Sequence, residues 1–135
     1  MTQNSNPFDD VPVVFSYTRA QAIADGVLVD LTPFAKQAGF KVPVACTATV
    51  WEGFIVPSEA MKAWGQSERG RAADVMWMLF LAISKRPATD PNPELLYEVL
   101  FQQEPDKTVA VQLKAVCGPG DNGEPVLTIM GTNED

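Results

Sequence analysis

Three glycines near the end of the chain have the spacing of a nucleotide-binding fingerprint. Residues 117–128 read CGPGDNGEPVLT, in which Gly118, Gly120 and Gly123 form a G-x-G-x-x-G pattern. Such glycines bind a dinucleotide when they join a strand to a helix, because the amides of the helix N-terminus then receive the pyrophosphate. Here the glycines lead into EPVLTIM, whose proline and β-branched residues favour another strand, and Pro119 removes an amide from the cradle. The pattern therefore predicts a hairpin loop and no cofactor.

The residue types present limit other kinds of chemistry. The chain has no histidine, so Ser-His-Asp triads, Cys-His pairs and histidine-containing zinc sites are excluded within one chain. The acidic pairs Asp9–Asp10 and Glu104–Asp106 lie in terminal or proline-rich segments, where solvated charge is normal. The DNGE sequence at 121–124 lacks the one-three-five spacing of a calcium loop. We expect no metal site and no catalytic residue, with a carboxylate- or metal-dependent enzyme as the alternative.

One group of polar residues forms the candidate pocket or interaction surface. Tyr17, Arg19 and Asp30 lie near two short elements, and Asp121 and Glu124 lie in the glycine loop. The competing interpretation is purely structural. Under that interpretation Tyr17 ends an apolar strand and Arg19 occupies the first exposed turn of a helix.

The two cysteines are expected to be free thiols. The N-terminal sequence MTQNSNPFDD has neither the basic nor the apolar region of a secretory signal, which predicts a cytoplasmic protein in a reducing compartment. Residue alternation places Cys117 on the buried face of a strand, where it would act as a small hydrophobe. The environment of Cys46 is left undecided by the sequence.

The charge of the chain bears on its partners. The formal net charge is −7, so the average field repels nucleic acid and anionic lipid. The longest apolar run, residues 75–83, is also too short to span a membrane. We therefore predict no direct nucleic-acid binding and no membrane insertion. The charge itself serves solubility or, alternatively, provides an acidic surface that competes with nucleic acid for a basic partner.

The first half of the chain predicts short helices. Thr18 is a suitable N-cap for a helix at 19–24 that ends before Gly26, and VLVD at 27–30 is a candidate strand or extended link. A second helix begins at Thr32–Pro33 and ends at Gly39. Periodicity does not decide residues 40–56, for which we favour a helical turn beginning near Thr47.

The longest helix is expected at about 68–85, after the cap residue Ser67; Ser58 is a second candidate cap. Its apolar stripe comprises residues 72, 75, 76, 79 and 83, and Trp77 and Phe80 extend the apolar surface further. A helix this apolar should be covered on most of its sides.

Beyond a proline-rich link at 87–93 the hydrophobic period changes from helical to alternating. The inward-facing residues are predicted to be Leu95, Tyr97, Val99, Phe101, Val109, Val111, Leu113, Ala115 and Cys117. A short strand precedes the helices at 13–17, and a third C-terminal strand covers 126–130. The predicted fold is α+β: a three-stranded antiparallel C-terminal meander packed on the central helix, with the short N-terminal strand and helices. Residues 1–10 are expected to form a flexible arm and residues 11–135 a single domain.

Two segments together resemble a known but uncharacterised family. FSYTRAQAIADGVLVDLT at 15–32 and LKAVCGPGDNGEPVLTIM at 113–130, with ADVMWMLFLAI at 73–83 between them, are similar to short bacterial proteins of unknown function found on plasmids, phages and integrative elements. This resemblance implies a small acidic accessory protein of a mobile genetic element. Such a protein would act without catalysis, by binding a protein partner such as a host defence or replication component.

Overall fold

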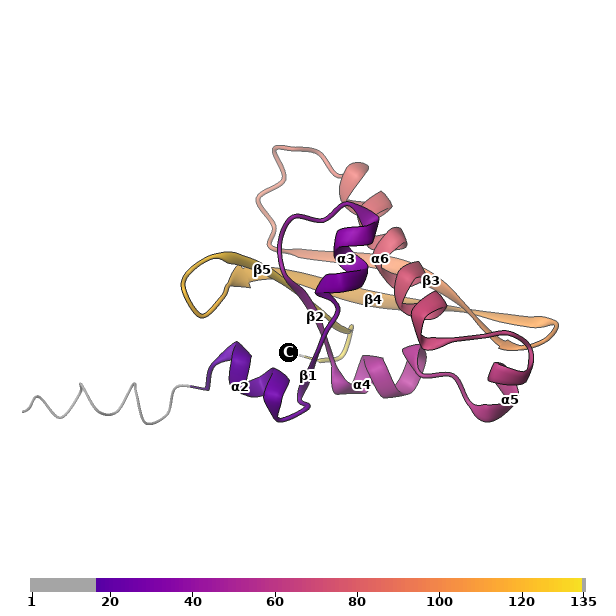
Figure 1. Cartoon of the computed structure of the whole chain (residues 1–135). Coiled ribbons are helices and arrows are strands. Elements are labelled where there is room, and N and C mark those ends of the chain that lie inside the picture. Colours follow the sequence, from indigo (N-terminus) through magenta and orange to yellow (C-terminus); the bar gives the residue numbers. More distant parts are fainter. Residues whose placement is uncertain (1–16, 135) are drawn as a thin grey trace, which may run out of the picture.

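The structure is a computed structural model that describes residues 17–134 (Figure 1). The predicted arm at 1–10 lies outside the described residues, as does the predicted strand at 13–17 except for Tyr17, which is not in a strand. The fold is α+β, as predicted. It consists of one five-stranded mixed sheet with helices packed against it.

The sheet has the strand order β1-β2-β5-β4-β3. Its strands are β1 (Leu28–Asp30), β2 (Val44–Thr47), β3 (Glu94–Glu104), β4 (Lys107–Pro119) and β5 (Pro125–Gly131). Strands β3, β4 and β5 are antiparallel neighbours, whereas β2 pairs with β5 in parallel. The sheet is therefore larger than the three-stranded meander expected from the sequence.

The strand that the sequence did not reveal is β2. Val44, Ala45 and Cys46 are all fully buried, so successive residues do not alternate between apolar and polar. Such a strand has no period-two signal, because it is covered on both faces. The predicted helical turn follows directly, with Thr47 as its N-cap.

Several helices begin directly after a residue whose side chain caps them, as the sequence indicated. Their bounds are α2 (Arg19–Ala24), α3 (Thr32–Ala38), α4 (Ala48–Val50), the π-helix η1 (Trp51–Ile55), α5 (Glu59–Ala63) and α6 (Glu68–Ser84). The side chain of Thr18 accepts a hydrogen bond from the Gln21 amide, and the Gln21 side chain accepts one from the Thr18 amide. Ser58 and Ser67 cap α5 and α6 through their hydroxyls. Each cap satisfies an amide that has no partner inside its helix.

The hydrophobic core lies between α6 and one face of the sheet, which we call the inner face. Figure 1 shows α3 and α6 side by side over this face. The core residues of α6 and the sheet are Ala72, Val75, Met76, Leu79, Val44, Cys46, Tyr97, Val99, Phe101, Leu113, Ala115 and Ile129. The expectation that α6 is covered on most sides was wrong, because Trp77 is 51 % exposed and Ile83, a predicted stripe residue, is exposed as well.

The opposite face of the sheet, the outer face, carries the residues that alternate with the core residues. Helix α2 lies against this face, because Arg19 bonds to Thr128, and Thr128 alternates with the core residue Ile129 on β5. The coverage by α2 is partial. On the edge strand β3, Leu96 is 54 % exposed and Leu100 is 58 % exposed.

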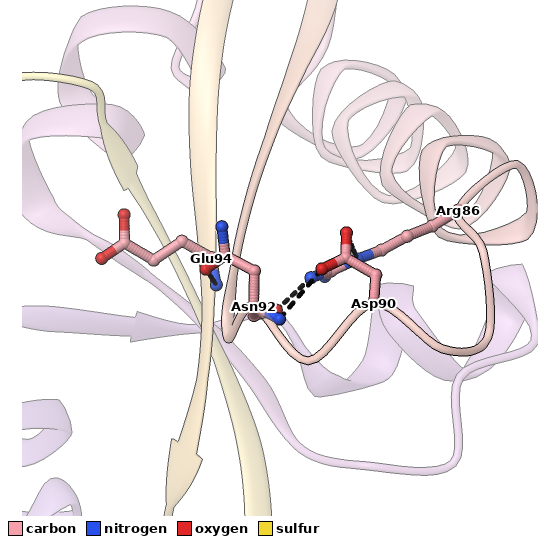
Figure 2. Close-up of polar contacts among 4 residues, drawn as sticks. All are labelled: Arg86, Asp90, Asn92 and Glu94. Carbon is pink, nitrogen blue, oxygen red and sulfur yellow. Dashed lines mark hydrogen bonds and ion pairs between the residues drawn. The ribbon is translucent and has the colours of Figure 1, made fainter.

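The proline-rich link between α6 and β3 is ordered by its polar side chains (Figure 2). Arg86 forms an ion pair with Asp90 at 3.0 Å and donates a hydrogen bond to the carbonyl of Asn92. The Asp90 carboxylate accepts the Asn92 amide, and the Asn92 side chain accepts the Glu94 amide. The hydrogen bond from Arg86 holds the pKa of the Asp90 carboxyl below its usual range. Figure 2 shows that the Glu94 carboxylate points away from this cluster.

Candidate functional site

A hollow of about 230 Å³ lies beneath α2, on the outer side of the sheet. Four of the five candidate residues line it: Arg19 from α2, Asp30 at the end of β1, and Asp121 and Glu124 from the β4–β5 loop. Elements that are far apart in the sequence therefore bring one cation and three carboxylates together. We call this the Arg19 hollow.

The guanidinium of Arg19 is directed toward β5. One of its terminal nitrogens donates to Thr128 Oγ1 and the other to the carbonyl of Leu127, both at 2.7 Å. Burial lowers the pKa of Arg19, and the surrounding carboxylates oppose that shift. Within residues 17–134 no carboxylate lies within ion-pair distance of this guanidinium. Arg19 therefore fastens α2 to the sheet mainly through neutral acceptors.

Asp121 caps α2 from a distant part of the chain. Its two carboxylate oxygens accept hydrogen bonds from the amides of Arg19, at 2.7 Å, and Ala20, at 3.0 Å. These amides belong to the first turn and have no acceptor within the helix. A carboxylate at a helix N-terminus is also favoured by the helix dipole. Asp121 thus has a structural role in this hollow.

The other two carboxylates of the hollow also bond locally. Asp30 Oδ1 accepts both the amide and the hydroxyl of Thr32, at 3.0 and 2.6 Å, and so orders the start of α3. Glu124 Oε1 accepts the amide of Asn122 at 3.0 Å and so folds back over its own loop. Because each carboxylate serves a backbone amide, the arrangement suits fixed structure better than proton transfer.

Tyr17, the fifth candidate residue, is not among the residues lining the Arg19 hollow. Its hydroxyl donates to Asp25 Oδ2 at 2.6 Å on an exposed part of the surface. That hydrogen bond raises the pKa of Tyr17, because only the neutral hydroxyl can donate it.

The three glycines of the loop form a hairpin connection, as the sequence predicted. Gly118 lies within β4, and the chain after Gly123 enters β5 and not a helix. Gly123 has a φ of 81°, a left-handed conformation that favours glycine. A side chain at Gly120 would press against the folded-back Glu124 carboxylate. A helix N-terminus, which a dinucleotide fingerprint requires, does not follow these glycines.

Sequence reasoning missed Arg71, a charged side chain that is only 3 % exposed. Its Nε donates to the carbonyl of Phe54 at 2.7 Å, and Nη1 donates to Gln66 Oε1 and the Gln102 carbonyl. The guanidinium also lies 4.9 Å from the centre of the Phe101 ring, within cation–π range. Burial lowers the pKa of Arg71. Arg71 therefore joins η1, α6 and the β3–β4 hairpin. Nothing in the sequence distinguishes this buried arginine from the exposed Arg69 two residues earlier.

The structure corrects the environment predicted for Cys117 and decides that of Cys46. Cys117 is exposed, so its predicted burial was wrong: its strand position is near the end of β4, beyond the cover of the helices. Cys46 is fully buried on β2, and burial raises the pKa of its thiol to about 12. Neither cysteine is in a disulfide. The part of the chain described contains no group of three or more Cys, Asp or Glu side chains that could hold a metal ion.

The outer face of β3 and β4 forms a second candidate surface. Four directly opposed pairs make it up, and we call them the outer strip: Glu94–Val116, Leu96–Lys114, Glu98–Gln112 and Leu100–Ala110. A hollow of about 440 Å³ adjoins the strip, and its lining includes Glu94, Lys114, Val116 and Met130 from the sheet and Arg19 from α2. The apolar surface of the strip lies on a sheet.

From residue 17 to residue 134 no helix is long and apolar enough to cross a membrane.

These features define a small, acidic α+β domain with a half-covered sheet. The chain belongs to a family of unknown function, DUF6573, whose model matches residues 4–135. That match includes both segments on which the family resemblance depends. Neither the curated proteins nor the solved structures contained a match to the chain.

Proposed function

We propose that this protein is a non-enzymatic, cytoplasmic accessory protein of a mobile genetic element, and that it acts by binding another protein. The proposed partner class is a host defence or replication component. The observation that carries the proposal is the exposure of Leu96 and Leu100 on the outer strip. Both leucines are more than half exposed on one sheet face, on either side of Glu98, and extended apolar surface rimmed by polar residues marks interaction sites.

The rest of the strip supports this assignment. Leu96 and Leu100 lie on the same face of β3, about 14 Å apart along the strand. Val116, opposite Glu94 on β4, extends the apolar surface toward the neighbouring hollow. The inner-face residues between the leucines, Tyr97 and Val99, already fill the core. The outer leucines therefore contribute little to folding and are available for binding.

The rival function, a carboxylate- or metal-dependent enzyme, has weaker support. Acid–base catalysis needs a carboxyl group that is free to exchange a proton with substrate. In the Arg19 hollow, Asp30 and Asp121 each accept two hydrogen bonds from nearby donors. Both carboxylates therefore serve the start of a helix, α3 for Asp30 and α2 for Asp121.

Affinity purification from the native host tests the proposal. The tagged full chain should retain one stoichiometric partner, and the double variant Leu96→Thr, Leu100→Thr should lose it. Threonine is chosen because it keeps strand propensity while removing apolar surface. The matched control is Trp77→Gln, Ile83→Gln, which removes two exposed apolar side chains from α6. A partner lost equally from both variants, or from neither, would contradict the proposed surface.

A further inference from the structure

We infer that the occupant of the outer strip is a cationic amphipathic helix of a partner protein. This inference rests on the proposed function and specifies the chemistry of the partner. It depends on three properties of the strip: its dimensions, its charge and the way its side chains point.

The dimensions of the uncovered area match one helix. Two strands lie about 5 Å apart, so β3 and β4 with their side chains present a strip about 10 Å wide, close to the diameter of a helix. From Glu94 to Leu100 the strand extends about 20 Å, which corresponds to about 13 residues of helix. Helix α2 already lies against the other half of the same face, through Arg19 and Thr128. A docked helix would complete this layer.

The side chains of the strip point out of the sheet, so the strip recognises its partner through a face and not through the free strand edge. Leu96 and Leu100 are separated by four residues on the same face of β3. An apolar row of Leu or Met side chains along a helix would lie over them and reach the hollow beside Val116. A strand added at the edge of β3 would leave both leucines exposed.

The charge of the strip selects a cationic partner. Glu94 and Glu98 flank Leu96 on the outer face, and neither forms an ion pair with any residue from 17 to 134. The one lysine of the strip, Lys114, donates from its Nζ to the neutral Glu134 carbonyl at 2.6 Å and keeps its charge, so two glutamates and one lysine leave the strip with a net negative charge. Two unpaired carboxylates beside exposed leucines complement Lys or Arg residues flanking an apolar row.

The same charges disfavour a second copy of this chain. Two strips placed face to face would bring together the Glu94 and Glu98 carboxylates of both copies with only one Lys114 from each, so carboxylates would outnumber ammonium groups. Each copy also carries a formal net charge of −7, which adds repulsion at longer range. A basic partner would instead be attracted both by the glutamates of the strip and by the net charge of the chain.

Two synthetic peptides of about 18 residues, or five helical turns, test the inference. Both carry leucines at helical spacing, flanked by lysines in one peptide and by glutamates in the other. Binding to the full chain is measured by calorimetry at low and moderate salt. The lysine peptide should bind, with an affinity that falls as salt rises, and the glutamate peptide should not.

Matched variants separate a specific site from general attraction. Glu94→Gln, Glu98→Gln should weaken binding of the lysine peptide about tenfold, since both removed charges are at the site. Glu52→Gln, Asp106→Asn changes the net charge equally at exposed positions outside the strip and should leave binding nearly unchanged. Equal weakening by the two pairs would overturn the inference. So would tighter binding of the glutamate peptide, or no binding of the lysine peptide.

The two proposals fail separately. If a host partner is lost with Leu96→Thr, Leu100→Thr but the lysine peptide does not bind, protein binding stands and the cationic helix is wrong. If the lysine peptide binds as expected but no host partner is retained, the proposed function is wrong and the chemistry of the strip stands. A chain that sediments as a dimer, and as a monomer with the two leucines replaced, would show a second copy on the strip and overturn the inference.

Discussion

Asp121 and Arg19 are joined by a hydrogen bond that spans 102 positions of the sequence. The Asp121 carboxylate accepts the Arg19 amide at 2.7 Å, and its other oxygen accepts the Ala20 amide. The Arg19 side chain extends from the same turn to Thr128 on β5. The glycine loop and helix α2 therefore hold each other on the outer face of the sheet.

Replacing Asp121 with alanine should destabilise the protein by about 1 kcal/mol, the usual effect of removing an N-terminal helix cap. The reason is that two amides of α2 would lose their acceptor. Thermal or urea unfolding measures the effect. Asp106→Ala, at the tip of the β3–β4 hairpin, is the control and should change stability by less than about 0.5 kcal/mol. Equal stability of the two variants would show that the cap contributes nothing.

Alanine substitution should distinguish the three glycines of the fingerprint pattern. Gly118→Ala should be tolerated, because the added methyl group meets nothing within 4 Å. Gly123→Ala should cost about 1 kcal/mol, because its φ of 81° strains any residue with a side chain. Gly120→Ala should be destabilising as well, because its methyl group would meet Glu124 and lie 3.0 Å from Val126 Cγ1. Urea unfolding of the three variants checks this order, and a destabilised Gly118→Ala would contradict it.

The sequence predicted those parts of the fold that carry a local signal. Thr18, Ser58 and Ser67 marked helix starts because each capping hydroxyl acts on its own first turn. Strand β2 was not predicted, since Val44–Cys46 is buried on both faces and has no alternation. The parallel pairing of β2 with β5 joins segments about 80 residues apart, and no local pattern encodes such a pairing.

Replacing Arg71 with methionine should destabilise the protein by about 2 kcal/mol or more. The change keeps an apolar side chain in the core but leaves the Phe54 and Gln102 carbonyls without their donor. Arg69→Met, two residues earlier and exposed, is the matched control and should change stability by less than about 0.5 kcal/mol. Unfolding curves compare the two variants. Similar small effects would show that the buried guanidinium is not a structural link.

The two thiols should react very differently. At mildly alkaline pH a thiol reagent should modify Cys117 in the folded protein and leave Cys46 unmodified, because Cys46 is buried with a pKa of about 12. The variant Cys117→Ser should therefore react only after denaturant is added. Rapid modification of two thiols per folded chain would contradict the burial of Cys46.

The raised pKa of Cys46 also predicts a loss of stability at high pH. The unfolded thiol ionises near its ordinary value of 9.0, whereas the folded thiol ionises only at about 12. Over this range the folded chain binds more protons, so stability declines as pH rises. Burial raises the pKa of the Tyr97 hydroxyl and acts in the same direction. Urea unfolding of Cys46→Ala across this range should show a shallower decline than the original chain.

The sequence identified the candidate residues but did not predict how they are arranged. Arg19 and Asp30 were selected because they lie near two short elements, whereas Asp121 was selected in the glycine loop. That they surround one hollow depends on how the β4–β5 loop meets α2, a contact between distant segments. The outer strip was missed because the sequence analysis followed only the inward-facing residues of β3, and only the observed coverage of the sheet shows that Leu96 and Leu100 are exposed.

Site-specific photo-crosslinking tests the proposed binding surface most directly. A photoreactive amino acid replaces Leu100 on the outer strip or, in a second variant, Ile83 on the opposite layer. Both variants are expressed as full chains in the native host and irradiated. The proposal predicts that position 100 crosslinks to one host protein and position 83 does not. A crosslinked partner from position 83, with none from position 100, would contradict it.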